Sequence, residues 1–545
     1  MMSSRLRHAL PLLVAALLLH LVLIQPNHLI GLTWGRLVSF PLELPLILFA
    51  LLALGRTRAA PIFRGALTAV LTLIAMLKLA DMISFDALSR NFNPVSDLFL
   101  VDAFIRLLSG TIGPVLTGLA LIAAVLAVAL LAVLIWWATG VWSRVALPRL
   151  ATGGAAAAAV LAATVVVADV GDRLDRWELA IDLPGTAFTS RLGLRRAMLA
   201  NTTLAELRAF RSAMMEDPFA SRTDLFAGID RDVIVIFIES YGRTSFDTPF
   251  YADLHLATLS EQAEALAALG LSTRSGFLTA PTQGGQSWLS HATLANGLWV
   301  DNQVSYGAVL SSGRQTLYHH AANAGFRTAT VMPQITLDWP ESARMGFETV
   351  LVAEDLGYEG LNFNWVTMPD QFSLTALDRL LRTGTHDRPL FAQVALVSSH
   401  APWTPVPDML PWDAIGDGTE FNAMAQSGDT PAVVWRDRDR VRAQYRLALD
   451  YSLQAVMGYA ALHADDPPLL IVVGDHQAAG SIALDDRAEV PLHVIGPATL
   501  VDQLQVIAPD PGLIPEDGRA AIPMDAVRDL ILTAFAAPTE TALSN

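Results

Sequence analysis

Three side chains suited to holding a divalent metal ion directly follow apolar runs in this sequence. Glu239 comes after Val233–Ile238, and Asp475 and His476 come after Leu469–Val473 with one glycine between. Neither run alternates with polar residues, which predicts central strands of a parallel sheet that is covered on both faces. Because open α/β sheets place ligands at the carboxyl ends of their strands, we expect these three side chains to meet at one edge.

Ser287 is the candidate nucleophile. It follows the loop Thr282–Gln286 and opens a helical pattern, where free backbone N–H groups and the helix dipole favour an anion. A serine there is equally explained as a simple N-cap. With Glu239, Asp475 and His476 it would make three oxygen ligands and one nitrogen, a set suited to Mn²⁺, Zn²⁺ or Mg²⁺.

A metal on the serine oxygen would lower the pKa of the hydroxyl and orient it for attack on phosphorus or sulfur. His400 follows a third apolar run, Leu390–Val397. Its imidazole could hydrogen-bond substrate oxygens or protonate a leaving group.

The elements that must position these residues alternate along the second half of the chain, which predicts a mostly parallel α/β domain. Further strands are expected at Thr328–Met332 and Val490–Ile495, and helices at Leu259–Leu269, Leu317–Ala324, Ser373–Arg382, Val441–Leu462 and Asp525–Phe535.

Composition divides the 545-residue chain into a membrane part and an outer part. The chain is 53% hydrophobic with a mean hydropathy of +0.42, and most of the apolar excess lies in its first third. The formal net charge of −16 argues against nucleic-acid binding as the main task. The absence of cysteine excludes disulfides and thiolate metal ligands.

Five apolar segments are near the length needed to cross a bilayer. They are Leu10–Ile24, Leu37–Leu54, Ile62–Leu79, Ile112–Trp137 and Ala151–Ala168. Arginine is concentrated in the connections on one side, so the positive-inside rule puts the amino terminus in the cytoplasm and everything after about Asp169 outside. We expect a transmembrane domain at 1–169, a juxtamembrane connector at 170–229 with a helix at Arg191–Met215, and an outer catalytic domain at 230–545.

Glu43, Lys78 and Asp81 are ionisable residues near the outer ends of the second and third segments. Such groups are functional candidates in a membrane, and a transporter would need some. Because all three lie near helix ends, we expect them to reach the membrane interface instead.

Four motifs and their order resemble the membrane-anchored sulfatase-like branch of the alkaline phosphatase superfamily. Lipoteichoic acid synthases and the phosphoglycerol and phosphoethanolamine transferases are the most similar members. The motifs are Glu239-Ser240 after a strand, the loop T-Q-G-G-Q-S at 282–287, S-S-H-A-P-W from Ser398 to Trp403, and G-D-H-Q from Gly474 to Gln477. The five preceding apolar segments extend the resemblance over nearly the whole chain.

The resemblance implies one divalent metal ion, Mn²⁺ before Zn²⁺ or Mg²⁺, bound by Glu239, Asp475, His476 and the nucleophile Ser287. His400 would contact substrate. Lipoteichoic acid synthases have threonine where this chain has Ser287, and serine supplies the same oxygen.

Two departures concern substrate recognition. The tryptophan-x-arginine motif that grips glycerol phosphate in lipoteichoic acid synthases corresponds here to D-W-P-E at 338–341, which keeps Trp339 as a substrate contact but has no arginine. The Cys/Ser-x-Pro-x-Arg motif that classical sulfatases convert to formylglycine is absent.

The expected function is a metal-dependent transferase on the periplasmic face of a bacterial inner membrane. It would move a phospholipid head group, phosphoglycerol or phosphoethanolamine, through a phosphoserine to a hydroxyl of a periplasmic glucan, lipid or polysaccharide. Two alternatives are a hydrolase of the same fold, acting as a phosphodiesterase, phosphatase or sulfatase, and a non-catalytic membrane protein that binds an envelope component. A transporter is a further alternative.

Overall fold

The computed structural model describes residues 4–55, 57–88, 91–99, 101, 104–105, 108–109, 112–336 and 339–537. Asp338 of the D-W-P-E stretch therefore lies outside the described residues. The chain forms two compact units, Met1–Glu206 and Leu207–Asn545. We describe each unit by itself.

The first unit is a set of apolar helices, and each predicted segment falls on one of them. They are α1 (Ser4–Ile24), α3 (Glu43–Leu54), α4 (Ala59–Leu88), α6 (Pro114–Ser143) and α7 (Arg149–Asp172). Within the described residues, Ala59–Phe85, Pro114–Ser143 and Arg149–Asp172 are long and apolar enough to cross a membrane, whereas Ala9–Ile24 and Glu43–Leu54 are shorter. The structure thus supports three of the five predicted spans by length.

The second predicted segment begins later than expected. Its helix α3 starts at Glu43 and not at Leu37, which instead ends the short helix α2 (Trp34–Leu37). Pro41 explains the break, because a proline disfavours helical geometry in the residue before it.

The expectation that the three ionisable residues reach the membrane interface was wrong. Lys78 is fully buried and donates to Thr189 at 2.9 Å and to two backbone carbonyls at the end of α1. Asp81 is also fully buried and accepts from Arg196 at 2.6 Å. Helix α8 (Phe188–Met214) supplies both partners, close to the predicted helix Arg191–Met215. These charges are held inside the unit because partners from a distant part of the chain satisfy them.

The second unit is built on a mostly parallel sheet, in the order β4-β3-β5-β1-β6-β7-β2-β8, with β9 paired to β2. Its strands are β1 (Val233–Ile238), β2 (Ser272–Thr279), β3 (Arg327–Met332), β4 (Thr349–Val352), β5 (Leu390–Leu396), β6 (Leu469–Gly474), β7 (Glu489–Gly496), β8 (Asp510–Pro511) and β9 (Ile522–Pro523). The strands β4, β3, β5, β1 and β6 run parallel, and β7 runs antiparallel to both β6 and β2.

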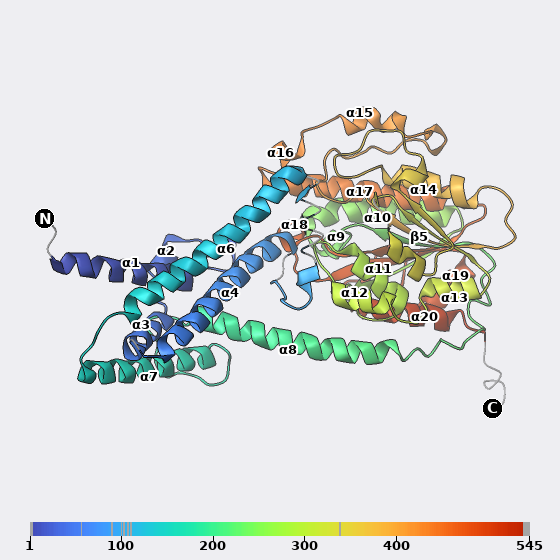
Figure 1. Ribbon diagram of the computed structural model, residues 1–545. Helices are drawn as coiled ribbons and strands as arrows, with labels where there is room; N and C mark the ends of the chain where they lie inside the picture. The colour runs from blue at the N-terminus through green and yellow to red at the C-terminus, as the bar shows by residue number, and fades with distance from the viewer. Residues whose placement is uncertain are drawn as a thin grey trace. The chain divides into compact units, whose positions relative to one another are not determined.

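Helices cover both faces of this sheet (Figure 1). One face carries α10 (Pro249–Ala268), α14 (Asp370–Leu377) and α17 (Arg438–Leu462), and the other carries α11 (Ser287–Asn296), α12 (Gln303–Leu310), α13 (Leu317–Asn323) and α20 (Val527–Ala534). Successive residues of β1 enter opposite cores, with Ile234, Ile236 and Ile238 on the first face and Val233, Val235 and Phe237 on the second. This two-sided burial is why the strand is apolar throughout.

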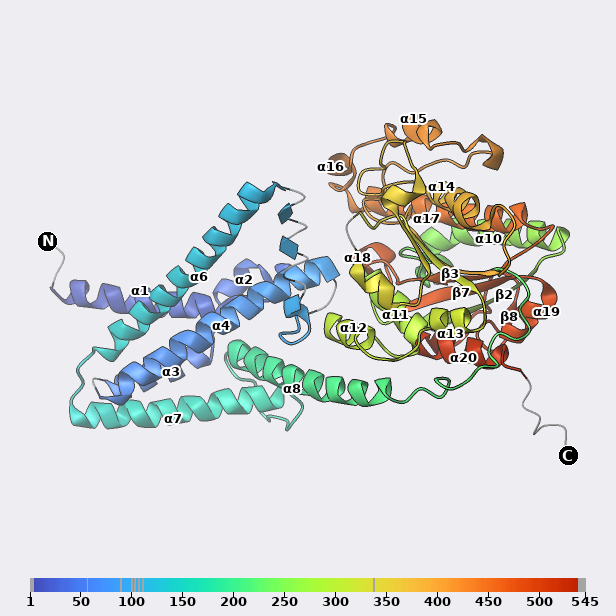
Figure 2. The same ribbon diagram turned by 45° about the vertical axis from the view of Figure 1, so that its right-hand side comes forward.

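Every helix and strand predicted for this unit is present, and the bounds agree within a few residues except that α10 begins at Pro249, ten residues before the predicted Leu259. The strands β4, β8 and β9 were not predicted, and neither was β2, which Figure 2 shows beside β7, β8 and α19 (Ala498–Val501). Its first three residues, Ser272, Thr273 and Arg274, are only partly buried, so the segment lacks the continuous apolar run that identified the central strands.

Candidate active site

Glu239, Asp475 and His476 meet at the carboxyl edge of the sheet. Each offers a ligand atom within 4.8 Å of those of the other two, and all three residues are buried. The strands β1 and β6 are parallel neighbours in which Ile238 pairs with Gly474, so the residues after both strands emerge side by side. The sheet register therefore brings together residues that are more than two hundred positions apart in the sequence.

Ser287 joins this group directly. It is the first residue of α11, and its hydroxyl donates to Glu239 Oε2 at 2.8 Å. The N-cap position belongs to Gln286, whose φ of 68° is left-handed, so the simple N-cap explanation of Ser287 was wrong. The serine oxygen is directed at the buried carboxylate and not at its own helix.

The loop before Ser287 is fastened to the loop after β6. Gln283 forms a β-bridge with Gln477, and the Gly284 N–H donates to the Gln477 carbonyl at 2.8 Å. Gly284 has a φ of 74°, and a Cβ there would meet backbone and side-chain atoms of Ala479 at 3.2 Å. These contacts fix the start of α11 relative to Asp475 and His476.

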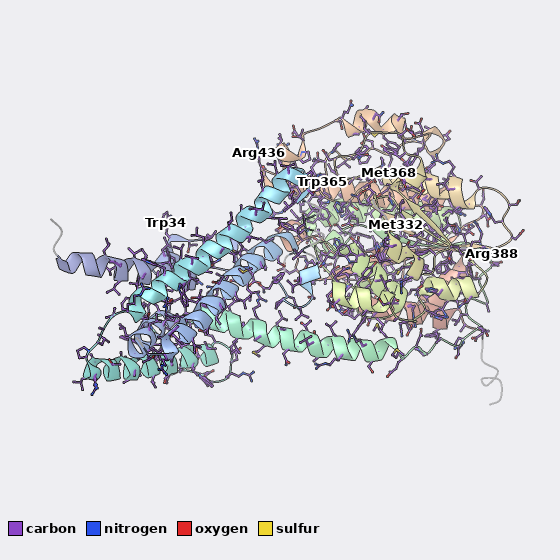
Figure 3. The ribbon with its side chains drawn as sticks, viewed as in Figure 1. Trp34, Met332, Trp365, Met368, Arg388 and Arg436 are labelled. Atoms are coloured by element: carbon purple, nitrogen blue, oxygen red, sulfur yellow. The ribbon has the colours of Figure 1, made fainter. Side chains whose placement is uncertain are left out.

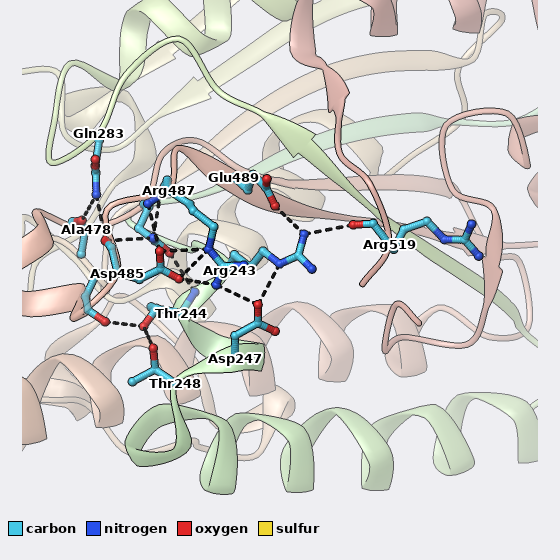
Figure 4. A network of polar contacts seen from close by, with 12 residues as sticks. Arg243, Thr244, Asp247, Thr248, Gln283, Ala478, Asp485, Arg487, Glu489 and Arg519 are labelled. Carbon is cyan, nitrogen blue, oxygen red and sulfur yellow. Dashed lines mark hydrogen bonds and ion pairs between the residues drawn. The ribbon is translucent and has the colours of Figure 1, made fainter. Parts of the chain in front are cut away.

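A layer of polar contacts supports these loops (Figure 4). Arg243, four residues beyond Glu239, pairs with Asp247 at 3.0 Å and with Glu489. The Gln283 amide donates to the Asp485 carbonyl at 3.0 Å, and Arg487 pairs with Asp485 and Asp247. The loops that carry the candidate site thus share one network of charged side chains.

The buried ionisable side chains of the site lie close together and shift one another's pKa values. Burial alone would raise the pKa of Glu239, but the charge of His476 holds it well below its usual range. Burial, together with the neighbouring Glu239, raises the pKa of Asp475 well above its usual range. Burial alone would lower the pKa of His476, yet the two carboxylates raise it to about 9.

The residues fit a divalent metal ion. His476 Nδ1 donates to the Gln477 carbonyl at 3.0 Å, which leaves Nε2 buried and without a hydrogen bond, 3.1 Å from Glu239 Oε1. Metal-bound histidines characteristically donate their other ring N–H to a carbonyl or carboxylate in this way. Two carboxylates, one imidazole nitrogen and a hydroxyl are a donor set for Mn²⁺, Zn²⁺ or Mg²⁺.

The two expected substrate contacts are placed differently. His400 lies beyond β5 at the same edge, close enough that its charge contributes to the lowered pKa of Glu239, and its Nδ1 bonds to the Ala401 carbonyl at 2.6 Å. Trp339 interacts instead with the Tyr306 hydroxyl. Among the described residues, no hydrogen bond, ion pair or ring contact joins Trp339 to the metal-site residues.

Three neighbours of the site were missed by the sequence analysis. His291 packs against Phe237 with ring centroids 4.1 Å apart and ring planes tilted by 37°, and burial lowers the pKa of His291 to about 4. Ser399 donates to the Glu239 carbonyl at 2.6 Å, and Tyr445 donates to the Ser240 carbonyl at 2.7 Å. His291 was detectable, because it lies four residues after Ser287 on one helix and so shares its face. The other two depend on tertiary contacts alone.

Comparisons with known proteins show which part of the chain is similar to a known family. Residues 231–498 match the family model described as Sulfatase. The chain is similar in structure to the lipoteichoic acid synthase LtaP from Listeria monocytogenes, with 13% identity over 61% of this chain and 78% of that chain and a TM-score of 0.37. It is also similar to the Streptococcus pyogenes phosphoglycerol transferase GacH in complex with sn-glycerol-1-phosphate, with 13% identity over 61% of this chain and 91% of that chain and a TM-score of 0.36.

A third similar structure is the zinc complex of the periplasmic domain of EptC from Escherichia coli. It has 14% identity over 55% of this chain and 82% of that chain, with a TM-score of 0.35. No curated protein matches the chain.

Proposed function

We propose, from the premise that residues 231–498 form a sulfatase-like domain of the alkaline phosphatase superfamily, that this chain is a metal-dependent phosphotransferase. It would move a phosphoglycerol or phosphoethanolamine head group from a phospholipid to an acceptor hydroxyl of the cell envelope. The observation that carries the proposal is the 2.8 Å hydrogen bond from the Ser287 hydroxyl to Glu239. That bond joins a candidate nucleophile to a buried group of metal-binding residues.

Glu239, Asp475, His476 and Ser287 would hold one divalent metal ion, with Mn²⁺ preferred over Zn²⁺ or Mg²⁺. When bound, such an ion lowers the pKa of a coordinated hydroxyl and offsets negative charge that develops on phosphoryl oxygens.

The first half-reaction uses residues placed at one edge of the sheet. The Ser287 hydroxyl, which is hydrogen-bonded to Glu239, loses its proton to solvent, and Oγ forms a bond to the donor phosphorus. The bond between phosphorus and the diacylglycerol oxygen breaks, and His400 protonates that leaving oxygen. The product is a phosphodiester on Ser287 that carries the head group.

The second half-reaction reverses these roles. His400 accepts the proton of the acceptor hydroxyl, whose oxygen forms a bond to phosphorus. The bond between phosphorus and Ser287 Oγ breaks, and Oγ takes a proton from solvent. Trp339 would contact the head group. Since the 338–341 stretch lacks arginine, the phosphoryl oxygens would be bound by His400 and the metal site.

The proposed donor is a phospholipid, which explains why the chain would have membrane-spanning helices. The apolar helices α4, α6 and α7 would hold the enzyme beside its phospholipid substrate. We propose the inner membrane of a bacterium as the location, with residues 1–169 transmembrane, 170–229 as connector and 230–545 catalytic on the periplasmic side. The acceptor would be a periplasmic glucan, a lipid or a polysaccharide.

Intact-mass measurement of the Mn²⁺-loaded full chain after brief exposure to mixed bacterial phospholipids tests the proposal, with Ser287→Ala as the control. We expect a mass increase in the wild type alone, and its size would distinguish glycerophosphate from phosphoethanolamine. Release of the head group without an adduct would assign a hydrolase. No release from a metal-loaded protein would contradict catalysis altogether and favour an envelope-binding role.

A further inference from the structure

A polar cavity opens beside α17 in the outer unit. Its volume is about 520 Å³, and it lies between the segment Thr404–Met409, the turn Ser427–Asp429 and one side of α17. That volume is within the usual range for ligand pockets. The chain that forms its roof carries the short helices α15 (Asn422–Ala425) and α16 (Pro431–Val434), which Figures 1 and 2 show passing over α17.

We propose that this cavity binds a neutral carbohydrate and is the acceptor subsite of the enzyme. The word acceptor rests on the proposed transferase function, whereas binding of the carbohydrate does not.

The charges that line the cavity select against anionic ligands. Asp408, Asp429 and Asp450 contribute three carboxylates against one cation, Arg440, and Arg440 is already paired with Asp429. A phosphate or an acidic polysaccharide would meet a net negative wall. Neutral hydroxyl groups, by contrast, pair well with carboxylates, which accept hydrogen bonds, and with amides, which both donate and accept.

Two of the lining groups have hydrogen-bonding capacity to spare. The Asp408 carboxylate and the Gln444 amide make no hydrogen bond with any other part of the described chain, and neither side chain is buried. A third, Gln454, bonds to Asp450 through its amide nitrogen and keeps its oxygen available. The cavity therefore presents unpaired donors and acceptors to a ligand.

An exposed aromatic ring stands beside this cavity. Trp435 follows the lining residue Val434, and 49% of its surface is exposed. One face of the indole stacks on the buried Trp403, with ring centroids 5.8 Å apart and planes within 4° of parallel, and its N–H donates to the Pro402 carbonyl at 3.3 Å. Figure 3 labels the adjacent Arg436 on the same segment. A rigidly held, half-exposed indole is a suitable platform for the apolar face of a sugar ring.

Residues that are close in sequence to the lining residues contact Glu239 and its neighbour Ser240. The Trp403 indole donates to the Ser399 carbonyl at 2.6 Å, and the Ser399 hydroxyl donates to the Glu239 carbonyl at 2.6 Å. On the other wall, Tyr445 is the neighbour of Gln444 and bonds to the Ser240 carbonyl. The segment Ser399–Thr404 and the helix α17 therefore each run from a contact with the metal-site loops into the wall of the cavity.

Binding is tested on the purified full chain in a detergent without a sugar head group. Saturation-transfer NMR and calorimetric titration would use maltotetraose, laminaritetraose and cellotetraose, with glycerol 3-phosphate and phosphoethanolamine as anionic and amine probes. We expect at least one tetrasaccharide to bind in the cavity. We expect neither glycerol 3-phosphate nor phosphoethanolamine to bind there. Gln444→Ala and Trp435→Ala should each weaken that binding at least tenfold, while Gln503→Ala, on a surface turn elsewhere, should leave it unchanged.

Three outcomes would overturn the proposal: no binding of any tetrasaccharide, equal binding by all variants, or phosphoethanolamine binding that the same two substitutions abolish, which would assign an amine site. The Ser287→Ala variant should still bind the sugar when no donor lipid is present. The binding experiment is therefore independent of the intact-mass experiment. If the Ser287 adduct forms and no sugar binds, the cavity proposal fails alone. If sugars bind and no adduct forms, the transferase proposal fails alone.

Discussion

Replacing Asp475 with asparagine should make the metal-free outer unit more stable while abolishing its response to metal. Burial and the adjacent Glu239 raise the pKa of Asp475 in the folded state. An acid with a raised folded-state pKa loses stabilising free energy as the pH rises from its unfolded value, near 4, through the folded one. At neutral pH Asp475 therefore stabilises the fold less than it does near pH 4. Asparagine carries no charge but keeps a side-chain oxygen. That oxygen can accept the hydrogen bond that the Ser240 N–H donates to Asp475 at 2.8 Å.

The size of the metal response follows from binding linkage. At a metal concentration of about 100 times Kd, a ligand that binds only the folded state stabilises it by about 2.7 kcal/mol. For a unit the size of Leu207–Asn545, an unfolding entropy of about 0.7 kcal/mol per kelvin converts this to a Tm increase of about 4 °C. Ser287→Ala keeps both carboxylates and the imidazole and should retain most of the increase. Asp475→Asn should show an increase of less than about 1 °C at the same metal concentration.

Differential scanning calorimetry of the full chain at neutral pH, in EDTA and in excess MnCl₂, measures both quantities on the transition of the outer unit. The expected pattern is a higher Tm for Asp475→Asn than for wild type in EDTA and a lower one in MnCl₂. A variant that is less stable than wild type in EDTA yet equally stabilised by Mn²⁺ would refute the assignment of Asp475 as a metal ligand. It would show that the carboxylate has a structural role.

Three further predictions concern other parts of the chain. His400→Ala should reduce turnover by about 10²-fold or more while leaving the Mn²⁺-induced Tm increase intact, as measured by head-group release and calorimetry on the same sample. Burial lowers the pKa of His255 to about 4, so its stabilising contribution is complete above pH 6.5 and is lost as the pH falls toward 4. The wild type should therefore lose folding free energy between neutral pH and about pH 5. His255→Gln should reduce that loss by about 2 kcal/mol, as measured by urea unfolding at the two pH values. Arg196→Met should cost the first unit about 3–5 kcal/mol, because it leaves Asp81 buried and unpaired, and adding Asp81→Asn should restore most of the lost thermal stability.

The central strands and the residues that follow them could be predicted because one physical signal fixes both. A strand buried on two faces must be apolar along its length, and it must stop being so where it reaches the edge of the sheet. Glu239 and Asp475 mark those ends, and parallel pairing of β1 with β6 then places them together. Their assignment as metal ligands remains a prediction, although the geometry agrees with it.

The partners of the membrane charges could not be predicted in this way. Lys78 and Asp81 are satisfied by Thr189 and Arg196, which lie more than a hundred residues later in the chain. The spacing of apolar and polar residues within α4 gives no information about these partners. A rule based on distance from the helix end placed these groups at the interface, and it failed because buried charge is stabilised by specific partners and not by position along a helix.

The cavity beside α17 depends on the same kind of long-range information. Its roof, between His400 and Arg438, contains only helical segments of three or four residues, which are too short to be predicted from composition. The stacking of Trp435 on Trp403 closes that segment against α17 and joins it to Ser399. A sequence reading can therefore identify the chemistry at the strand ends, while the features that would choose an acceptor arise only when the intervening loop folds over the sheet. For this reason substitutions in the roof should change acceptor preference while leaving formation of the Ser287 adduct intact.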